Sequence, residues 1–459
     1  MSLRLFVPIV ALACLALAAC APAPRPVGTP VPPAEPSGAP VDTTAPPPPR
    51  VEPQAPPPRP EGVPSHEPLL AIGLAWDLDS LTVAPLGEAE VDGPADAKLQ
   101  PGERLSVRRT RHGALCFMRG GRKAWQAAMW RGDTLWMTAT EGGGESPARL
   151  FRWNNRSWRG QIKIFVNARG SLTLATRLPL ETYLLGVLPG EIGPLSDELK
   201  EAGRAQAMAA RSFTLFYRGR RGVEGFDLFS TVEDQVYGSV ETERPLATEC
   251  VRSTAGQVAT YGGQPIRANY SSTCGGITAD VWEAWPDPPR PYLRSRRDAG
   301  AGADYCQASP HYRWHEEWSV AEFLANLRKF GPSYGVPLPA SGLGQLRDVR
   351  VRSRSRSGRV WVLDVTTSEG HVLVPAYSLR QVLRRPGNPA AILRSNLFKI
   401  GVRRDERSGR VLAVAANGAG SGHGVGLCQT GALGMARAGV KGEDIIRHYF
   451  AAVEIRRQY

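Results

Sequence analysis

Beyond residue 20 the sequence has no second apolar run that could form a transmembrane helix, and no repeat of the length found in solenoid proteins. The glycine-rich stretch at 418–434 lacks the Lys-Ser/Thr ending of a P-loop and does not open a βαβ unit, so we reject a phosphate-binding loop.

Acidic residues are outnumbered by basic ones, 43 against 56, which gives a formal net charge of +13 over 459 residues. This length allows two or three domains. The charge suits an anionic partner, such as nucleic acid, membrane headgroups or an acidic cell-wall glycopeptide.

The first twenty residues, MSLRLFVPIVALACLALAAC, predict a signal peptide (1–20) with the lipobox pattern of bacterial lipoproteins. We expect Cys20 to become an acylated N-terminus that anchors the protein to a membrane without a transmembrane helix. A proline-rich linker follows at 21–66, with the composition of an extended spacer. The protein is therefore expected outside the cytoplasm, on the outer membrane or facing the periplasm if the cell has two membranes. Nucleic acid is then not an expected partner.

The remaining chain predicts an α+β fold. A β-rich N-terminal region is expected over 67–176, because short alternating segments are separated there by Gly, Asn and Asp. The stretch from Ile162 to Leu174 reads as a hairpin. A mixed β-rich core packed with a few helices is expected over 177–459, beginning with a helix whose start signals include Ser196.

That helix is predicted to be buried along one narrow stripe of small side chains. Arg204 and Arg211 lie two turns apart on it and would share a different face. A single carboxylate, Glu191, stands just ahead of the helix and is expected on a turn. It either interacts with the positive end of the helix or serves as a proton donor and acceptor. Partial burial would raise the pKa of Glu191 and the arginines would lower it, so the residues alone leave the direction open.

Removing Cys14 and Cys20 leaves five cysteines, an odd number for an oxidising compartment. For Cys274 and Cys306 three interpretations compete: a disulfide, a zinc site completed by His311, or a thiol nucleophile served by a histidine. Cys428 follows His423 by five residues, but their position in a glycine-rich loop does not ensure that the side chains meet.

Four ordered segments resemble the SpoIID/LytB family, and the likeness covers roughly 70 to 455. They are LPLETYLLGVLPGEIG followed by AQAMAARSF, STVEDQVYGSVETERP, TAGQVATYGGQPIRANYSSTCGGIT, and GHGVGLCQTGALGMA. Members of this family remodel peptidoglycan. One branch comprises lytic transglycosylases that act on glycan stripped of its peptides, and another was described as enhancers of amidases.

The resemblance implies a catalytic role for Glu191 and for Arg211, the arginine of the Ala-Ala-Arg motif. Arg204 occupies a place usually held by lysine. The stretch from Glu191 to that place is about two residues longer than the family pattern, and Cys428 and Thr430 stand where serine and tyrosine are common. Some members use the equivalent of Cys274 for zinc, so a structural zinc ion stays open although no cofactor is required.

We therefore expect a lytic transglycosylase that cleaves the MurNAc-GlcNAc backbone to 1,6-anhydro products. One glutamate suffices for this reaction, because the C6 hydroxyl of the sugar is the nucleophile. Further substrate-binding residues are expected at Arg204, Asp234, Gln235, Tyr237, Ser272, His423 and Gln429; a structural role is the alternative for Arg211, His423 and the 234–237 segment. Two other hypotheses remain: a non-catalytic, peptidoglycan-binding activator of an N-acetylmuramoyl-L-alanine amidase, and a zinc or thiol hydrolase at Cys274, Cys306 and His311.

Overall fold

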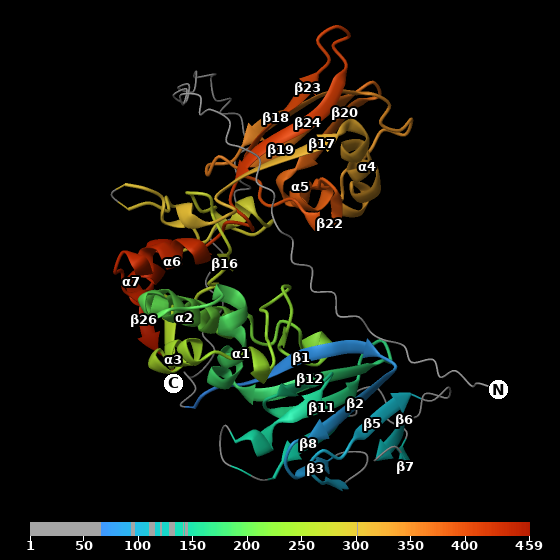
Figure 1. The fold of residues 1–459 in the computed structure, drawn as a ribbon, viewed down its shortest axis with the longest axis vertical. Helices are drawn as coiled ribbons and strands as arrows, with labels where there is room; N and C mark the ends of the chain where they lie inside the picture. Colours follow the sequence, from blue (N-terminus) through green and yellow to red (C-terminus); the bar gives the residue numbers. More distant parts are fainter. Residues whose placement is uncertain are drawn as a thin grey trace, which may run out of the picture. The chain divides into compact units, whose positions relative to one another are not determined.

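The computed structural model describes residues 66–92, 97–109, 115–119, 122–127, 134–140, 142, 146–300 and 302–459. The predicted signal peptide with Cys20, and the linker up to residue 65, lie outside these described residues. Within them, no helix has both the length and the apolar character needed to cross a bilayer. Helices and strands are mixed along the chain, which confirms the α+β class (Figure 1).

Two sheets contain the described strands up to Pro179, as the alternating pattern predicts, and β13 joins one of them from later in the chain. The seven-stranded sheet has the order β13-β1-β12-β11-β8-β3-β4. Its strands are β1 (Leu69–Leu78), β3 (Ala89–Asp92), β4 (Ala97–Leu99), β8 (Thr134–Ala139), β11 (Gln161–Val166), β12 (Leu172–Pro179) and β13 (Leu228–Phe229). The six-stranded sheet has the order β10-β9-β2-β5-β6-β7. Its strands are β2 (Ser80–Pro85), β5 (Leu105–Arg109), β6 (Leu115–Arg119), β7 (Arg122–Ala127), β9 (Phe151–Trp153) and β10 (Arg156–Trp158), with the 3-10 helix η1 (Pro147–Arg149) before β9.

The predicted hairpin is formed by β11 and β12, which pair antiparallel with Val166 opposite Leu172. Asn167 closes its turn, because the side-chain oxygen accepts hydrogen bonds from the backbone N–H groups of Arg169 and Ser171. β1, β12 and β11 lie side by side in Figure 1. β12 then leads directly into the first long helix.

That helix is α1 (Leu180–Ile192), which the sequence analysis did not predict. Pro189 and the following glycine indicate a helix break, yet buried contacts of Leu184 and Leu188 hold the helix through Pro189 until Gly193, whose φ is 77°. Glu191 therefore lies in the last turn of a helix. The expectation that it sits on a turn ahead of one is wrong.

The predicted helix after Ser196 is confirmed as η2 (Asp197–Leu199) continuing into α2 (Lys200–Tyr217). Its buried surface is not one narrow stripe, because every residue from 205 to 214 is buried. α2 packs against four elements around it: α1, α3 (Pro245–Ser253), α7 (Gly442–Tyr449) and β14 (Gln257–Tyr261). β14 forms a sheet with β15 (Gln264–Pro265) and β26 (Glu454–Arg457).

Two of the glycine-rich motif segments meet in a short parallel pair, β16 (Tyr270–Ser271) with β25 (Leu427–Cys428). The predicted short helices follow as α6 (Gln429–Arg437) and α7. α6 begins at Cys428, whose Sγ accepts the Gly431 N–H at 3.3 Å. Connecting 3-10 helices are η3 (Gly222–Glu224), η4 (Val240–Thr242), η5 (Val281–Glu283) and η6 (Tyr305–Ala308).

A second hydrophobic core lies within 314–416, which the sequence analysis did not separate from the rest. Its sheets are β17-β24-β23, β18-β19-β20 and β21-β22. The strands are β17 (Arg313–Ser319), β18 (Leu346–Arg354), β19 (Val360–Thr367), β20 (Gly370–Pro375), β21 (Arg384–Arg385), β22 (Asn388–Ile392), β23 (Phe398–Arg404) and β24 (Val411–Ala419). The helices are α4 (Val320–Phe330), η7 (Pro332–Tyr334) and α5 (Ala376–Val382). A capping box of Ser319 and Glu322 starts α4.

Candidate functional site

Three separate segments converge on the carboxylate of Glu191. Its Oε1 accepts the backbone N–H of Val236 at 2.9 Å, and its Oε2 accepts Nε2 of Gln429 at 3.4 Å. The hydroxyl of Tyr270 also donates a hydrogen bond to this carboxylate. Each partner belongs to a different motif segment, so the fold brings the separated motifs together around this one acid.

Glu191 is partly exposed, and its environment favours the protonated form. Burial raises the pKa of Glu191, and the hydrogen bonds from Val236, Gln429 and Tyr270 offset only part of that rise. The carboxylate also lies at the C-terminal end of α1, where the helix dipole disfavours negative charge. The pKa is therefore raised, which settles the direction that the residues alone left open.

Glycines of α1 allow the Val236 segment to approach. A Cβ at Gly186 would lie 2.6 Å from the carbonyl oxygen of Gly238, and the Gly238 N–H donates to the Gly186 carbonyl at 3.0 Å. A Cβ at Gly190 would lie 3.2 Å from Val236 Cγ1. The close backbone contact along α1 is what places the Val236 N–H at Glu191.

A buried network lies behind Tyr270. Nε2 of Gln235 donates to the Tyr270 hydroxyl at 3.0 Å. The side-chain oxygen of Gln235 accepts the hydroxyls of Thr214 at 2.6 Å and Tyr183 at 3.3 Å. Gln235 is fully buried, so it does not line a groove as predicted; it holds the hydroxyl that touches Glu191.

Arg211 does not contact Glu191, contrary to the role that the resemblance implies for it. Its guanidinium forms a bidentate pair with Glu181, at 2.8 and 2.7 Å, and donates to the carbonyl of Gln257 at 3.0 Å. The Arg211 side chain is fully buried. The observed position fits the structural alternative for Arg211, a cation that ties α1 to α2 and β14.

The other predicted polar residues near this site are also engaged in the protein. Asp234 pairs with Arg220 at 3.1 Å and Arg221 at 3.0 Å, and its side chain is buried. Tyr237 is buried against Tyr183. Asp234 and Tyr237 therefore do not line an open groove, because their side chains are enclosed.

Arg204 is partly exposed on α2, so it does not share the environment of the buried Arg211. It bonds Glu201 at 3.0 Å and Ser253 at 3.2 Å, and neither of these residues bonds Glu191.

Ser272 and Gln429 do lie beside the site. Ser272 is exposed, and its carbonyl accepts the Thr430 hydroxyl at 2.8 Å, which fixes the start of α6 next to β16. Gln429 is partly exposed and reaches Glu191 directly. The hydroxyl at Thr430 thus joins two motif segments although the resemblance leads one to expect tyrosine there.

His423 holds the loop before β25 in place. Its Nδ1 accepts the Val425 N–H at 3.0 Å, its ring packs on Trp285 at 4.7 Å, and it bonds the Tyr270 backbone. Burial, together with the charge of nearby arginines, lowers the pKa of His423 to about 3. A neutral histidine with these bonds positions the Tyr270 strand, so the geometry favours the loop-tying alternative.

Four buried metal-ligand side chains form a second cluster: Cys274, Asp298, Cys306 and Cys428, whose ligand atoms all lie within 4.8 Å of one another. The two thiols of Cys274 and Cys306 are 3.8 Å apart and are not bonded, so the disulfide alternative is wrong. His311 is not part of the cluster, because its Nδ1 lies 2.9 Å from Arg394 Nη1. The predicted ligand set is therefore corrected by replacing His311 with Asp298 and Cys428.

The cluster fits a tetrahedral zinc ion. Two thiolates that are each about 2.3 Å from a tetrahedral zinc lie about 3.8 Å apart, the separation of the Cys274 and Cys306 sulfurs. Asp298 Oδ2 lies 3.3 Å from the Cys274 sulfur. Burial raises the pKa of the Cys274 and Cys428 thiols and raises the pKa of Asp298 to about 8, whereas hydrogen bonds from Cys274, Cys428 and Asp298 lower the pKa of Cys306 to about 2. Three of the four donors therefore favour their neutral forms, and a divalent metal ion would supply the positive charge that stabilises all four as ionised ligands.

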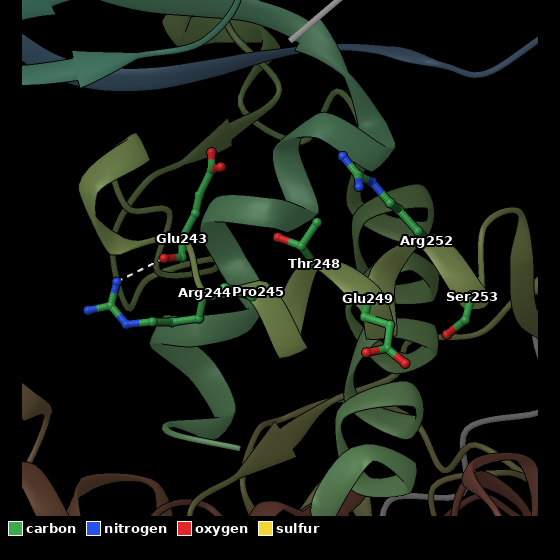
Figure 2. Close-up of a pocket in the computed structure, with 7 residues that line it drawn as sticks. All are labelled: Glu243, Arg244, Pro245, Thr248, Glu249, Arg252 and Ser253. Carbon is green, nitrogen blue, oxygen red and sulfur yellow. Dashed lines mark hydrogen bonds between the residues drawn. The ribbon is translucent and has the colours of Figure 1, made fainter. Parts of the chain in front are cut away.

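A separate pocket of about 700 Å³ lies along the outer face of α3 (Figure 2). Glu243, Arg244, Glu249 and Arg252 line it, so both signs of charge are present. None of the residues bonded to Glu191 belongs to this pocket, and we do not assign the proposed chemistry to it.

Sequence reasoning missed the contacts that define the site: Tyr270, the Val236 N–H and Asp298. Tyr270 and Val236 lie inside two of the quoted motif segments, beside the residues that were named. The position of Tyr270 inside a quoted motif could have identified it as a site residue. Asp298 carried none, because only the fold brings it between the cysteines.

Comparison with known proteins identifies the family to which this chain is similar. Residues 168–261 match the Stage II sporulation protein family, and residues 301–426 match a domain of unknown function (DUF8618). The chain is 30% identical over 294 residues to Stage II sporulation protein D of Bacillus subtilis, covering 61% of this chain and 74% of that protein.

Two other relatives are more distant in identity. The chain is 27% identical over 312 residues to an uncharacterized protein of Brachyspira hyodysenteriae, covering 66% of this chain and 74% of that protein. It is 27% identical over 306 residues to the amidase enhancer of Bacillus subtilis, covering 58% of this chain and 39% of that protein. With the motifs gathered around Glu191 and these matches, the chain belongs to the SpoIID/LytB family.

Proposed function

We propose that this protein is a peptidoglycan lytic transglycosylase that cleaves the MurNAc-GlcNAc bond with Glu191 as its acid and base. One observation carries the proposal: Glu191 is partly exposed, has a raised pKa and is held by three motif segments. A raised pKa suits a group that must give a proton at neutral pH.

In the proposed reaction, the protonated Glu191 gives its proton to the glycosidic oxygen as the C1–O bond breaks. Positive charge develops on the sugar ring, and the C6 hydroxyl oxygen of the same sugar forms the new bond to C1. The Glu191 carboxylate takes the proton of that hydroxyl and returns to its starting state. No water is consumed, and the product ends in a 1,6-anhydro ring.

The pairing of two other acids, Glu181 and Asp234, supports a route with one carboxylate. Glu181 is paired with Arg211, and Asp234 is paired with Arg220 and Arg221. A hydrolase of the usual kind needs a second carboxylate to act as base or nucleophile. Both of these acids are engaged by arginines, so neither is free to serve as that second carboxylate.

Tyr270 is the proposed positioning residue. Its hydroxyl bonds Glu191, and the buried Gln235 fixes that hydroxyl. The network orients the acid without supplying a proton of its own, because burial raises the pKa of Tyr270 well above the ordinary tyrosine value.

Cys274, Asp298, Cys306 and Cys428 would hold the zinc ion, which supplies a structural cross-link between three loops. Cys428 opens α6, the helix that also carries Gln429. These residues thus stabilise the position of a Glu191 partner, and no step of the reaction passes through them.

An amidase activator is the second candidate function. The similarity to the amidase enhancer of Bacillus subtilis, 27% over 306 residues, favours it. In that case the chain binds peptidoglycan and an amidase, and Glu191 has no chemical role.

The test compares wild type with Glu191→Gln on whole sacculi and on peptide-free glycan, with release of anhydro sugars as the readout. The matched control is Glu233→Gln, which removes an exposed carboxylate from the same segment as Val236. We expect Glu191→Gln to lose about 10²- to 10⁴-fold of the rate. Cleavage that survives in Glu191→Gln contradicts the proposal, whereas equal amidase stimulation by both proteins without anhydro products supports the activator.

The proposed place of action is outside the cytoplasm, with the protein anchored through an acylated Cys20. Incorporation of labelled fatty acid into wild type, and not into Cys20→Ala, tests this anchor.

A further inference from the structure

Three arginines gather around two aromatic side chains at the end of α2, Phe216 and Tyr217, whose ring centroids are 4.9 Å apart. The guanidinium carbon of Arg290 lies 5.3 Å from the centroid of the Phe216 ring. Those of Arg220 and Arg267 lie 4.3 and 5.7 Å from the centroid of the Tyr217 ring. We call Arg220, Arg267 and Arg290 the arginine cluster.

The arginine cluster carries more positive charge than its acids neutralise. Arg267 bonds the carboxylate of Asp287 through Nη1. Arg220 lies 3.1 Å from the carboxylate of Asp234, but Arg221 bonds that same carboxylate at 3.0 Å. Asp234 thus serves two cations at once, and a net positive charge remains.

Arg290 is the member of the cluster that no acid engages. Its guanidinium makes no hydrogen bond or ion pair with any residue that the structure describes, and its Nε is buried without a partner. The Arg290 residue as a whole is partly exposed, so a ligand can approach it. The planar fork of N–H donors in a guanidinium matches the two oxygens of a carboxylate. Arg290 is therefore available to a carboxylate ligand.

The loop that holds Arg290 is stiff. Prolines stand at 286, 288 and 289, and each fixes its own backbone φ. The N–H of Asp287 donates to the carbonyl of Trp285 at 2.7 Å, and the N–H of Leu293 donates to the carbonyl of Arg290 at 3.1 Å. Because this loop is already ordered, little conformational entropy is lost when Arg290 binds a ligand.

Ring contacts connect the arginine cluster to Glu191. The hydroxyl of Tyr270 donates to Glu191, and the Tyr270 ring centroid lies 6.0 Å from that of Phe213. The centroids of the Phe213 and Tyr217 rings are 4.6 Å apart. Arg267 also precedes Tyr270 by only three residues, so their Cα atoms are at most about 11 Å apart. The cluster therefore adjoins the Glu191 site, with Phe213 between the Tyr270 and Tyr217 rings.

The chemistry of the glycan strand indicates which anion meets these arginines. GlcNAc carries no charge, and the one ionisable group of MurNAc is the carboxylate of its lactyl ether. A stem peptide is attached through that carboxylate as an amide, so the lactyl group is charged only where the peptide has been removed. The partly exposed rings of Phe216 and Tyr217 add apolar surface that suits the C–H face of a sugar.

We propose that the arginine cluster, through Arg290, binds the free lactyl carboxylate of a MurNAc residue and so selects strands from which the peptide has been removed. The proposal rests on the proposed function, because the ligand is the strand that is cut beside Glu191. It assigns Arg290 as a specificity-determining residue, with Arg220 and Arg267 adding positive charge around it.

The test measures binding of peptide-free strands to full-length Glu191→Gln, which leaves the strands uncut. It compares strands with free lactyl carboxylates to the same strands with those carboxylates converted to methyl amides. We expect the free acid to bind about tenfold more tightly, because the amide removes a charge-assisted hydrogen bond. Adding Arg290→Gln should abolish this difference, so that both strands bind as the amide does.

Arg290→Gln removes no hydrogen bond or ion pair with the described residues, so the fold should be retained. The matched control is Arg294→Gln, an exposed arginine four residues later that is not among the charges acting on Tyr217. It should preserve the tenfold preference.

Equal affinity for the two strands overturns the proposal, and so does a preference that survives Arg290→Gln. Tighter binding of peptide-bearing strands than of peptide-free ones also overturns it. Release of anhydro sugars by wild type from peptide-free strands, measured in parallel, separates the two proposals. Cleavage without a carboxylate preference overturns only the role of Arg290, whereas a preference that depends on Arg290 without cleavage overturns only the transglycosylase.

Discussion

The fully buried Arg211 forms a bidentate ion pair with the partly buried Glu181, with N–O distances of 2.8 and 2.7 Å, at the end of α1 remote in sequence from Glu191. Burial alone would raise the pKa of Glu181, but the bonds from Arg211, Tyr459 and the Gly256 N–H bring it below its ordinary value. The pair thus joins the start of α1, the middle of α2 and the C-terminal residue. Its role is to hold the helix that carries the acid.

We predict that Glu181→Gln lowers the free energy of unfolding by about 3–5 kcal/mol, because it leaves the fully buried Arg211 guanidinium without its carboxylate. Arg211→Ala should also destabilise, but by less, because the Glu181 carboxylate is partly exposed and keeps its bonds from Gly256 and Tyr459. Urea denaturation at neutral pH measures this. Arg218→Ala, an exposed arginine just after the same helix, is the control and should change little. Folding of Arg211→Ala with wild-type stability but without glycan cleavage would instead restore a direct catalytic role for this arginine.

Much of the fold follows from local patterns in the sequence. The alternation in β1, β2 and β8 and the turn at Asn167 predict the N-terminal strands, and the start signals near Ser196 predict η2 and α2. α1 was missed because Pro189 and Gly190 indicate a break, and only its burial against neighbouring segments overrides that signal.

The site itself could be predicted only in part. Motif matching singles out Glu191 and Gln429, since both lie in recognisable segments. It cannot say which side chain faces Glu191, so it placed Arg211 where Tyr270 lies. The metal-ligand cluster shows the same limit, because sequence spacing does not bring Asp298 between the cysteines; the folded loops do.

Glu191→Gln should stabilise the protein while it removes activity. The pKa of Glu191 is raised by burial, so the folded state favours the neutral form. That contribution to stability is fully present below the unfolded pKa and is lost as pH rises through the folded pKa. The melting temperature of Glu191→Gln should therefore exceed that of wild type at pH 8 and approach it at pH 4. The opposite trend would mean that the carboxylate is stabilised in its charged form.

Tyr270→Phe should shift the pH dependence of cleavage to higher pH. The lost hydroxyl stabilises the charged Glu191, so its removal raises the pKa of Glu191 further. It also leaves Nε2 of Gln235 without its Tyr270 partner, which should lower the free energy of unfolding by about 1–3 kcal/mol. Tyr217→Phe is the control, a half-buried tyrosine outside this hydrogen-bond network. A pH profile identical to wild type would show that Tyr270 does not position the acid.

Gly186→Ala should displace the Val236 N–H from Glu191, although Gly186 itself does not contact the carboxylate. The added methyl group would lie 2.6 Å from the Gly238 carbonyl and from the Tyr237 ring, so the segment that carries Val236 must move away from α1. We expect a loss of about 1–3 kcal/mol in the free energy of unfolding, together with a lower rate of cleavage. Gly222→Ala has open space around its new methyl group and should leave both unchanged.

Zinc should copurify with the full chain at one ion per molecule and should be removed slowly by a chelator, with a fall in melting temperature. Cys274→Ser and Cys428→Ser each replace a strong thiolate ligand and should lose the metal. Cys250→Ser is the matched control, because Cys250 is also a free, buried cysteine but lies outside the cluster, with its sulfur 3.5 Å from the Lys200 carbonyl. Elemental analysis of the wild type and the three variants shows whether this cluster holds the zinc.

Equal zinc in all four proteins would place the metal elsewhere in the chain. Absence of zinc from the wild type after purification without a chelator would mean that three thiols and a carboxyl group pack here without an ion. If the metal is present, its loss should also reduce cleavage, because Cys428 opens the helix from which Gln429 reaches Glu191.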